Sequence, residues 1–392
     1  MVDVHRLPVV DIHAHPFLDR GPVSLEEFTN LTAFGGGDQE YMEVGGVAFD
    51  DGVRAELQQI KQQTVYFKRL MLDLAAFLGV EPDPGTILEE RNKQLASGYT
   101  DYVRRLYEDA GIASIVFDFG IPLPSLDIQE VQAQLPIEVV PIYRIEPLIA
   151  DLLKTDLGWE EFSRAYEDAI SEALSSGGYR GVKSIIAYRT GLEVSPLSRT
   201  KDQGFQALDA IRRGLGGGSM KKLRDHLLCR ALELCIDHNV PMQIHTGMGD
   251  FEVNLVLCRP SYLMDLLRFP AYRACHVILV HTGFPYHGEA AYMTNVLPRV
   301  HLEVSEGIPF ASTAAWDIYE GVLSMAPVNK ICYGSDGYKV PEIIYTSAKL
   351  GKQALADVLD LQVERKMLTA ADAQSAAEAI LAGNARELYR LE

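Results

Sequence analysis

Short apolar stretches alternate with amphipathic stretches along most of the chain. Eight of the apolar stretches are nearly continuous, which is typical of parallel strands that are covered on both faces. They are residues 7–13, 112–119, 138–145, 179–188, 241–245, 276–281, 300–304 and 330–333. Helical patterns lie between most of them, so the chain predicts a (β/α)8 TIM barrel that occupies residues 1–392 as one domain. A doubly wound open sheet is disfavoured, because no glycine-rich phosphate turn follows the first stretch.

Two segments interrupt this repeat. Residues 20–110 separate the first two predicted strands and contain helical patterns at residues 24–31, 51–78 and 87–107. A second segment, residues 190–219, carries a run of glycines just before the next helix. Both segments follow the carboxyl end of a strand, where barrels place their active sites. We therefore predict a helical insertion after strand one that acts as a lid, the alternative being an elaboration that only packs on the barrel.

Charge and composition restrict the class of protein. Among the 392 residues, 36 Lys and Arg against 54 Asp and Glu give a net charge of -18. Such a chain repels phosphate backbones and anionic lipid, so we expect neither nucleic-acid nor membrane binding. Its densest basic cluster, residues 220–224, is interpreted as a solvated helix face. Five cysteines without a CxxC pair, no signal-peptide pattern and no long apolar run predict a cytoplasmic protein with reduced thiols.

Several metal-ligating residue types stand at the ends of predicted strands. His13 and His15 end the first strand, and their spacing of two places both imidazoles on one face. His245 and His281 end strands five and six, and Asp336 ends strand eight. Each histidine alone is more often a capping or core residue. Four strand ends in a consistent order instead favour a site for a divalent metal, with Zn²⁺, Fe²⁺ or Mn²⁺ suited to these donors.

The same motifs carry a family resemblance. HxH on strand one, Lys183 in VKSIIAYR, His245 in HTGMGD, His281 and Asp336 in YGSD together resemble the amidohydrolase superfamily. Within it the chain is most similar to the amidohydrolase-2 group, which includes the barrel domain of FluG- and nodulin-type proteins. The resemblance implies that His13, His15 and Asp336 hold one ion, and that His245 and His281 complete this site or hold a second.

Lys183 has two interpretations. In dinuclear members of the family, the lysine at this strand-four position is carboxylated and bridges the two ions. The alternative is a plain amine that pairs with a carboxylate or binds substrate.

The chemistry of such a site follows from general principles. A divalent cation lowers the pKa of water toward about 7 and polarises a carbonyl. Asp336 can take up the water's proton as a general base, and whichever of His245 and His281 does not hold metal could stabilise an oxyanion. Candidate substrate-binding residues are Tyr188, Arg189, Asp250 and His287. Arg189 could bind a carboxylate bidentately or pair with an acidic residue of the lid.

The leading hypothesis is a metal-dependent hydrolase, with zinc as the first expectation and Fe or Mn as alternatives. It would cleave a C–N or C–O bond in an amide, lactone or ester of a small carboxylate-bearing molecule. A metal-dependent decarboxylase or isomerase with the same site is the second hypothesis, and a non-catalytic metal-bearing binding module is the third. Glu306, after strand seven, is a weaker candidate that we expect in a solvated loop. A homo-oligomer is compatible with a barrel of this size, although no interface can be identified.

Overall fold

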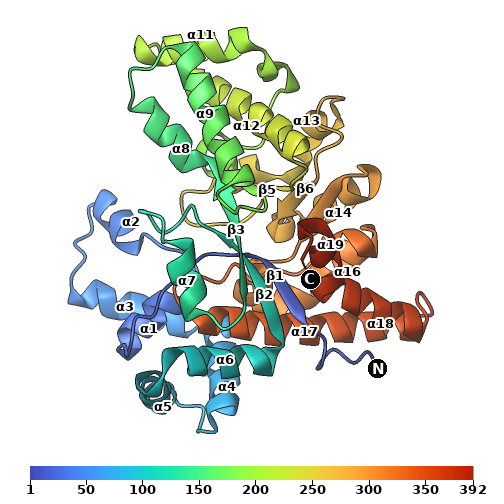
Figure 1. Ribbon diagram of the computed structural model, residues 1–392. Helices are drawn as coiled ribbons and strands as arrows, with labels where there is room; N and C mark the ends of the chain where they lie inside the picture. Colours follow the sequence, from blue (N-terminus) through green and yellow to red (C-terminus); the bar gives the residue numbers. More distant parts are fainter. Residues whose placement is uncertain (392) are drawn as a thin grey trace.

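Eight parallel strands form the centre of the protein in a computed structural model that describes residues 1–391 (Figure 1). They pair in sequence order. The bounds are β1 (Val9–Ala14), β2 (Ile112–Asp118), β3 (Glu138–Arg144), β4 (Val182–Ser184), β5 (Met242–His245), β6 (Val277–Val280), β7 (Val300–Glu303) and β8 (Ile331–Cys332). Main-chain hydrogen bonds, including Asp336 N to His13 O at 2.7 Å, join the segment after β8 to β1. The sheet is thus a nearly closed barrel, and the predicted fold class is confirmed.

Helices follow the strands and surround the barrel. Between β1 and β2 lie α1 (Leu25–Thr32), α2 (Asp38–Val44), α3 (Asp51–Gln62), α4 (Val65–Leu78), α5 (Pro84–Ser97) and α6 (Tyr99–Ala110). Up to β6 follow α7 (Ile128–Gln134), α8 (Ile145–Leu153), α9 (Trp159–Ser175), α10 (Ile186–Thr190), α11 (Lys201–Arg212), α12 (Ser219–His238) and α13 (Met264–Arg268). The remainder are α14 (His287–Val296), α15 (Gly307–Phe310), α16 (Ala315–Leu323), α17 (Pro341–Glu364), α18 (Ala370–Glu378) and α19 (Asn384–Tyr389), with a π-helical turn at Ala379–Gly383. Within residues 1–391, no helix combines the length and hydropathy required to cross a membrane.

The insertion after β1 contains six helices where the sequence pattern indicated three. Residues 51–78 divide because Thr64 caps the start of α4, its side chain accepting a hydrogen bond from Phe67 N. Residues 87–107 divide at Gly98, whose φ of 157° few other residues adopt. The short α2 has no buried residue, so it lacks the apolar stripe that reveals a helix in a sequence. In Figure 1 these helices, blue to teal, group on one side of the barrel, where α17 packs against α4 and α6.

Apolar side chains fill the interior of the barrel at the amino-terminal ends of the strands. Val10 and Ile12 of β1 form an apolar cluster with strand residues around the barrel and with Ala385 and Tyr389 of α19. Gln243 Nε2 donates to Ile12 O at 2.6 Å and to Tyr389 Oη at 2.7 Å, which ties the C-terminal helix to the strands. Because this end is packed shut, access is left to the carboxyl ends of the strands.

Strand four is shorter than the sequence predicted, and a helix replaces its second half. Glu146 Oε1 accepts hydrogen bonds from Ser184 Oγ at 2.7 Å and from Ile185 N at 2.9 Å. The second bond engages a main-chain N–H that would otherwise be free to continue the ladder, and the chain turns into α10. The segment at residues 190–219 is also more regular than expected, because it contains a 3₁₀ turn (Pro196–Arg199) and α11.

Candidate metal centre

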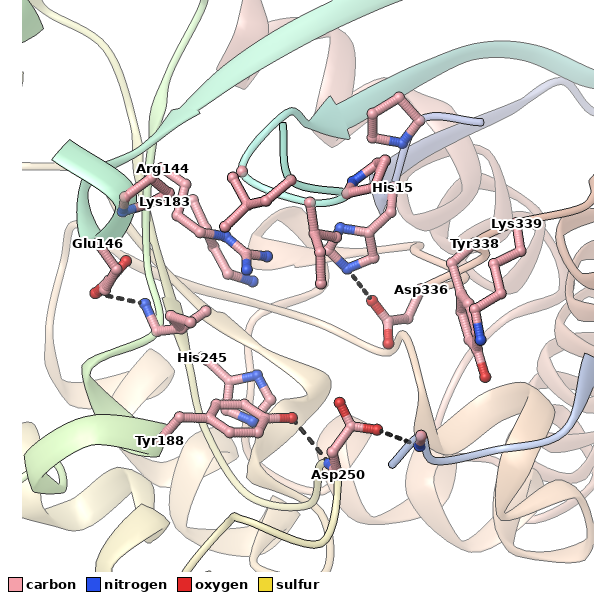
Figure 2. A pocket seen from close by; sticks show the side chains of 18 of the residues that line it. His15, Arg144, Glu146, Lys183, Tyr188, His245, Asp250, Asp336, Tyr338 and Lys339 are labelled. Carbon is pink, nitrogen blue, oxygen red and sulfur yellow. Dashed lines mark hydrogen bonds and ion pairs between the residues drawn. The ribbon is translucent and has the colours of Figure 1, made fainter. Parts of the chain in front are cut away.

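The predicted metal ligands converge at the carboxyl ends of the strands. All of them line one cavity of about 770 Å³, and Figure 2 shows His15, Lys183, His245 and Asp336 around it. They come from β1, β4, β5 and the segments that follow β6 and β8. His13, Lys183, His245, His281 and Asp336 are buried. The register of β1 on β2 shifts between Asp11 and Ala14, the stretch that contains His13.

One group of donors lies around the Asp336 carboxylate. Asp336 Oδ1 is 3.2 Å from Nε2 of His13 and 3.2 Å from Nε2 of His15. Lys183 Nζ is 3.1 Å from the same nitrogen of His13. Ligand atoms bound at about 2.1 Å to one tetrahedral ion are separated by roughly 3 Å, so this spacing matches a shared cation. Asp336 Oδ1 is buried and has no hydrogen-bond partner within residues 1–391.

A second group consists of His245, His281 and Glu306, whose donor atoms lie within 4.8 Å of one another. His245 Nε2 is 2.8 Å from the carbonyl of Met248, which can only accept, so this nitrogen carries the proton. His281 Nδ1 is 2.8 Å from Ser305 Oγ, whose own hydrogen is donated to a Glu303 oxygen 2.6 Å away. His281 must therefore also donate from that nitrogen.

These tautomers leave two lone pairs facing each other. His245 Nδ1 and His281 Nε2 are 3.1 Å apart, and neither carries a hydrogen. Two lone pairs at this distance repel unless a cation lies beside them. The donor set, three buried imidazoles and a carboxylate within a few ångströms, thus fits a divalent metal. His281 also has a donor atom within 4.8 Å of those of His13 and Asp336, so the two groups of possible ligands adjoin.

Burial keeps these histidines neutral. It lowers the pKa of His13 to about 4. Burial also holds the pKa of His245 and of His281 well below the ordinary value. The nearby Lys183 adds to this effect for His245, and His245 adds to it for His281. Burial alone would raise the pKa of Asp336, but the adjacent imidazoles of His13 and His15 reverse this and hold it well below the usual range. Neutral imidazoles and an ionised carboxylate are the forms that bind metal.

Backbone strain is concentrated at the same place. His281, Thr282, Glu306 and Asp336 have positive φ values of 64°, 52°, 58° and 56°, although none is glycine. Each such residue costs on the order of 1–3 kcal/mol, and strain of this kind collects at functional sites. Thr282 and Glu306 were not singled out for this role by any sequence pattern, because backbone angles leave no trace in residue type.

Glu306 corrects a sequence-based expectation. It was expected in a solvated loop, but it is buried and lines the cavity, with Oε2 3.7 Å from His281 Nδ1. Burial raises its pKa well above the ordinary value, and the nearby Asp336 and Asp250 carboxylates add to this. Its position after strand seven was the only available signal, since a loop glutamate is exposed in most proteins.

Three of the four predicted substrate-binding residues line the cavity, and one does not. Tyr188, Arg189 and Asp250 are among the lining residues. Asp250 N donates to Tyr188 Oη at 2.9 Å, and its Oδ1 accepts from Gly36 N of the insertion at 3.0 Å (Figure 2). His287 is not brought to this cavity. It starts α14 and faces Asp317 of α16 at 3.7 Å, because the chain turns away after His281.

Several charged lining residues were not proposed as site residues from the sequence. Arg144 pairs with Asp118 through both carboxylate oxygens, and Glu146 and Lys339 also line the cavity. Arg224 belongs to the basic cluster that was expected to be a solvated helix face, but it lies in the cavity wall. Helical periodicity cannot distinguish a wall of a polar cavity from solvent, because both accept charged side chains.

Comparison with known proteins agrees with this geometry. The amidohydrolase family matches residues 164–391. Protein fluG of Emericella nidulans is 31% identical over 256 residues, which is 62% of this chain and 29% of fluG, so the chain spans less than a third of that relative.

Solved structures share the fold across nearly the whole chain. A Lactobacillus casei protein named as a candidate metal-dependent hydrolase has a TM-score of 0.82 at 22% identity, covering 99% of this chain and 96% of its own. A uronate isomerase of Bacillus halodurans has a TM-score of 0.67 at 12% identity, covering 99% and 94%. A glucuronate isomerase of Caulobacter crescentus has a TM-score of 0.65 at 14% identity, covering 99% and 92%. The nearly closed barrel, the histidines and carboxylates gathered at its open end and the family match lead to one conclusion: the chain belongs to the amidohydrolase superfamily, in its amidohydrolase-2 group.

Proposed function

We propose that this protein is a metal-dependent hydrolase that cleaves a C–N or C–O bond in an amide, lactone or ester of a small carboxylate-bearing substrate. The observation that carries the proposal is the unprotonated pair His245 Nδ1 and His281 Nε2, 3.1 Å apart beside the ionised Asp336. When bound there, a divalent cation would supply an activated water and a Lewis acid for the substrate carbonyl. Zinc suits imidazole and carboxylate donors in a closely spaced set, with Fe and Mn as the alternatives.

The roles of the residues follow from their hydrogen bonds. His13, His15 and Asp336 would hold one ion, and His245 and His281 would complete that centre or hold an adjoining one, with Lys183 between the groups. Asp336 is also the residue that would receive the proton of the attacking water at its carboxylate and pass it to the leaving group. The N–H groups of His245 and His281 are already engaged by Met248 O and Ser305 Oγ. This arrangement favours metal ligation over an oxyanion role for both.

The insertion after β1 is proposed as a lid. Phe34, Gly35 and Gly36 line the cavity, and the bond from Gly36 N to Asp250 Oδ1 ties this segment to the loop after β5. Tyr338 Oη also donates to Ala33 O, and Phe34 packs on Phe310, so a few contacts hold this segment over the cavity. When these contacts are made, the segment would exclude water from the reaction. The five buried free thiols support a reducing compartment, for which we propose the cytoplasm.

Isomerisation is the second candidate, and two of the structures with this fold are named as uronate or glucuronate isomerases. The experiment that separates the two is a mass-resolved screen of carboxylate-bearing amides, lactones, esters and uronic acids with zinc-loaded protein. Hydrolysis yields products that have together gained one water, whereas isomerisation conserves the mass of the substrate. A product of unchanged mass, or turnover that persists after chelation, would contradict the hydrolase proposal.

A further inference from the structure

Two arginines from different helices line the same cavity as the metal centre. Arg189 lies near the end of α10, and Arg224 lies in the first half of α12. Burial lowers the pKa of Arg224, and the nearby guanidinium of Arg189 lowers it further. Arg224 is half-buried and Arg189 is exposed at the cavity, so their like charges repel across a partly solvated wall, and an anion bound between them would relieve this repulsion.

The protein itself does not supply that anion. Neither arginine forms an ion pair or a side-chain hydrogen bond with any group in residues 1–391, and Arg224 Nε is buried without a partner. Glu146 is near enough to influence the pKa of Arg224. Its Oε1, however, is engaged by Ser184 Oγ and Ile185 N, and its Oε2 has no partner in the described chain. A buried charged donor without an acceptor is costly, which indicates that a bound molecule completes the arrangement.

A third arginine of the cavity wall, Arg144, does have a partner within the protein. Arg144 Nε donates hydrogen bonds to Asp118 Oδ1 at 3.1 Å and to Asp118 Oδ2 at 2.8 Å, so the Asp118 carboxylate neutralises this guanidinium. The fold can therefore pair a buried arginine with a carboxylate where the arginine is structural. It leaves Arg189 and Arg224 unpaired where they face the cavity.

We propose that Arg189 and Arg224 form a carboxylate subsite, a second anchor of the cavity beside the metal centre. This inference rests on the proposed function. It adds that the substrate carries a free carboxylate at a distance from the bond that reacts. Glu146 lies near Arg224 and, although burial raises its pKa, its carboxylate repels added negative charge when ionised, so a monoanionic carboxylate suits the arginine pair better than a phosphate dianion. A guanidinium fork binds the two oxygens of a carboxylate in parallel, so the subsite fixes orientation as well as charge.

The test is a binding measurement that needs no turnover. Benzoate and its neutral isostere benzamide are titrated by ligand-observed NMR into zinc-loaded and metal-stripped protein. We expect benzoate to bind in both forms and benzamide in neither, and Arg224→Met or Arg189→Met to weaken benzoate binding by about 10- to 100-fold, the usual scale for a charged hydrogen bond. Arg299→Met is the matched control, because Arg299 precedes β7, contacts His276 and does not line the cavity.

Three other results of these titrations would contradict the proposal. Unchanged benzoate affinity in Arg224→Met overturns the subsite, and so does benzoate binding that disappears on stripping the metal, since the carboxylate then binds the metal. Tighter binding of inorganic phosphate than of benzoate overturns the carboxylate assignment. If Arg224→Met does not fold, Arg224→Lys keeps the charge and removes the fork, and it should still weaken benzoate. Failure of the hydrolase proposal would appear separately, as zinc-loaded protein that binds benzoate through Arg224 but hydrolyses nothing.

Discussion

The Nδ1 atom of His245 lies 3.1 Å from the Nε2 atom of His281, and both nitrogens present lone pairs. The tautomers are set from outside the cavity, by the carbonyl of Met248 and by the hydroxyl of Ser305. Ser305 is in turn held by Glu303, so a buried carboxylate on β7 determines which nitrogen of His281 faces the metal centre. Second-layer bonds of this kind orient metal ligands and raise their basicity.

Removing metal should destabilise the protein, because a cation relieves the repulsion between these two nitrogens. At a free zinc concentration about 1,000 times Kd, binding stabilises the native state by about 4 kcal/mol. We expect His281→Ala to abolish most of the zinc-dependent rise in Tm measured by scanning calorimetry. His301→Ala is the control, since its partner is His276 and neither lines the cavity. An unchanged zinc-dependent rise in His281→Ala would argue against the metal centre.

Asp336→Asn should lower kcat by about 10²- to 10⁴-fold, the usual loss when a general base is removed. The amide keeps the shape of the side chain but cannot accept the proton. Asp317→Asn is the matched control, because Asp317 lies on α16, faces His287 of α14 and does not line the cavity. The measurement is a rate assay on any substrate found in the mass-resolved screen, with zinc content determined for each variant. Equal losses in the two variants would remove the assignment of Asp336 as the base.

Lys183 should carry a carbamate when zinc is loaded in the presence of ¹³C-bicarbonate. Its amine is buried, lines the cavity and lies 3.1 Å from His13 Nε2, within the first group of donors. We expect a carbamate carbon signal in the NMR spectrum that is absent in Lys183→Met, together with about two zinc ions per chain falling toward one in the variant. One ion per chain without a carbamate signal would identify Lys183 as a plain amine and favour the isomerase or decarboxylase hypothesis.

The Asp118–Arg144 pair should make stability depend on pH in the acid range. Burial alone would raise the pKa of Asp118, but the Arg144 guanidinium reverses this and holds it well below the ordinary value. Because the folded pKa is depressed, this stabilisation is complete above the unfolded pKa of about 3.9 and is lost as the pH falls below it. We expect Asp118→Asn to cost about 3–5 kcal/mol at pH 7, because Arg144 is left unpaired.

Urea unfolding of both proteins at several pH values measures this difference. It should stay constant between pH 7 and pH 5 and shrink below pH 4. A difference that grew as the pH fell would show that the ion pair does not stabilise the fold.

The contact between the insertion and the loop after β5 should depend on Gly37. A Cβ added at Gly37 would lie 2.4 Å from the Phe251 ring, so Gly37→Ala should displace this contact. Gly46→Ala is the matched control, because Gly46 has nearly the same φ, 78° against 77°, but no atom within 4 Å of an added Cβ. We expect faster proteolytic cleavage within residues 33–50 in Gly37→Ala only. Equal cleavage of both variants would mean that backbone strain, and not the Phe251 contact, is responsible.

The strands and their order could be predicted from the sequence because each is a short, continuous apolar run buried on both faces. His13, His15, His245, His281 and Asp336 could be located for the same reason, since each stands at the end of such a run. Strand four was predicted too long because a residue distant in the sequence ends it: Ser184 and Ile185 donate hydrogen bonds to Glu146, which precedes Ser184 by 38 positions.

The sequence by itself determined the barrel, the end of it that carries the chemistry and the types of donor gathered there. Only the tertiary structure decided which neighbouring polar residues take part. It buried Glu306 beside His281, turned His287 toward Asp317 and placed Arg224 in the cavity wall. The physical reason is that hydrophobic patterning records burial against an apolar core. A polar cavity and bulk solvent leave the same pattern, and only the path of the chain between elements separates them.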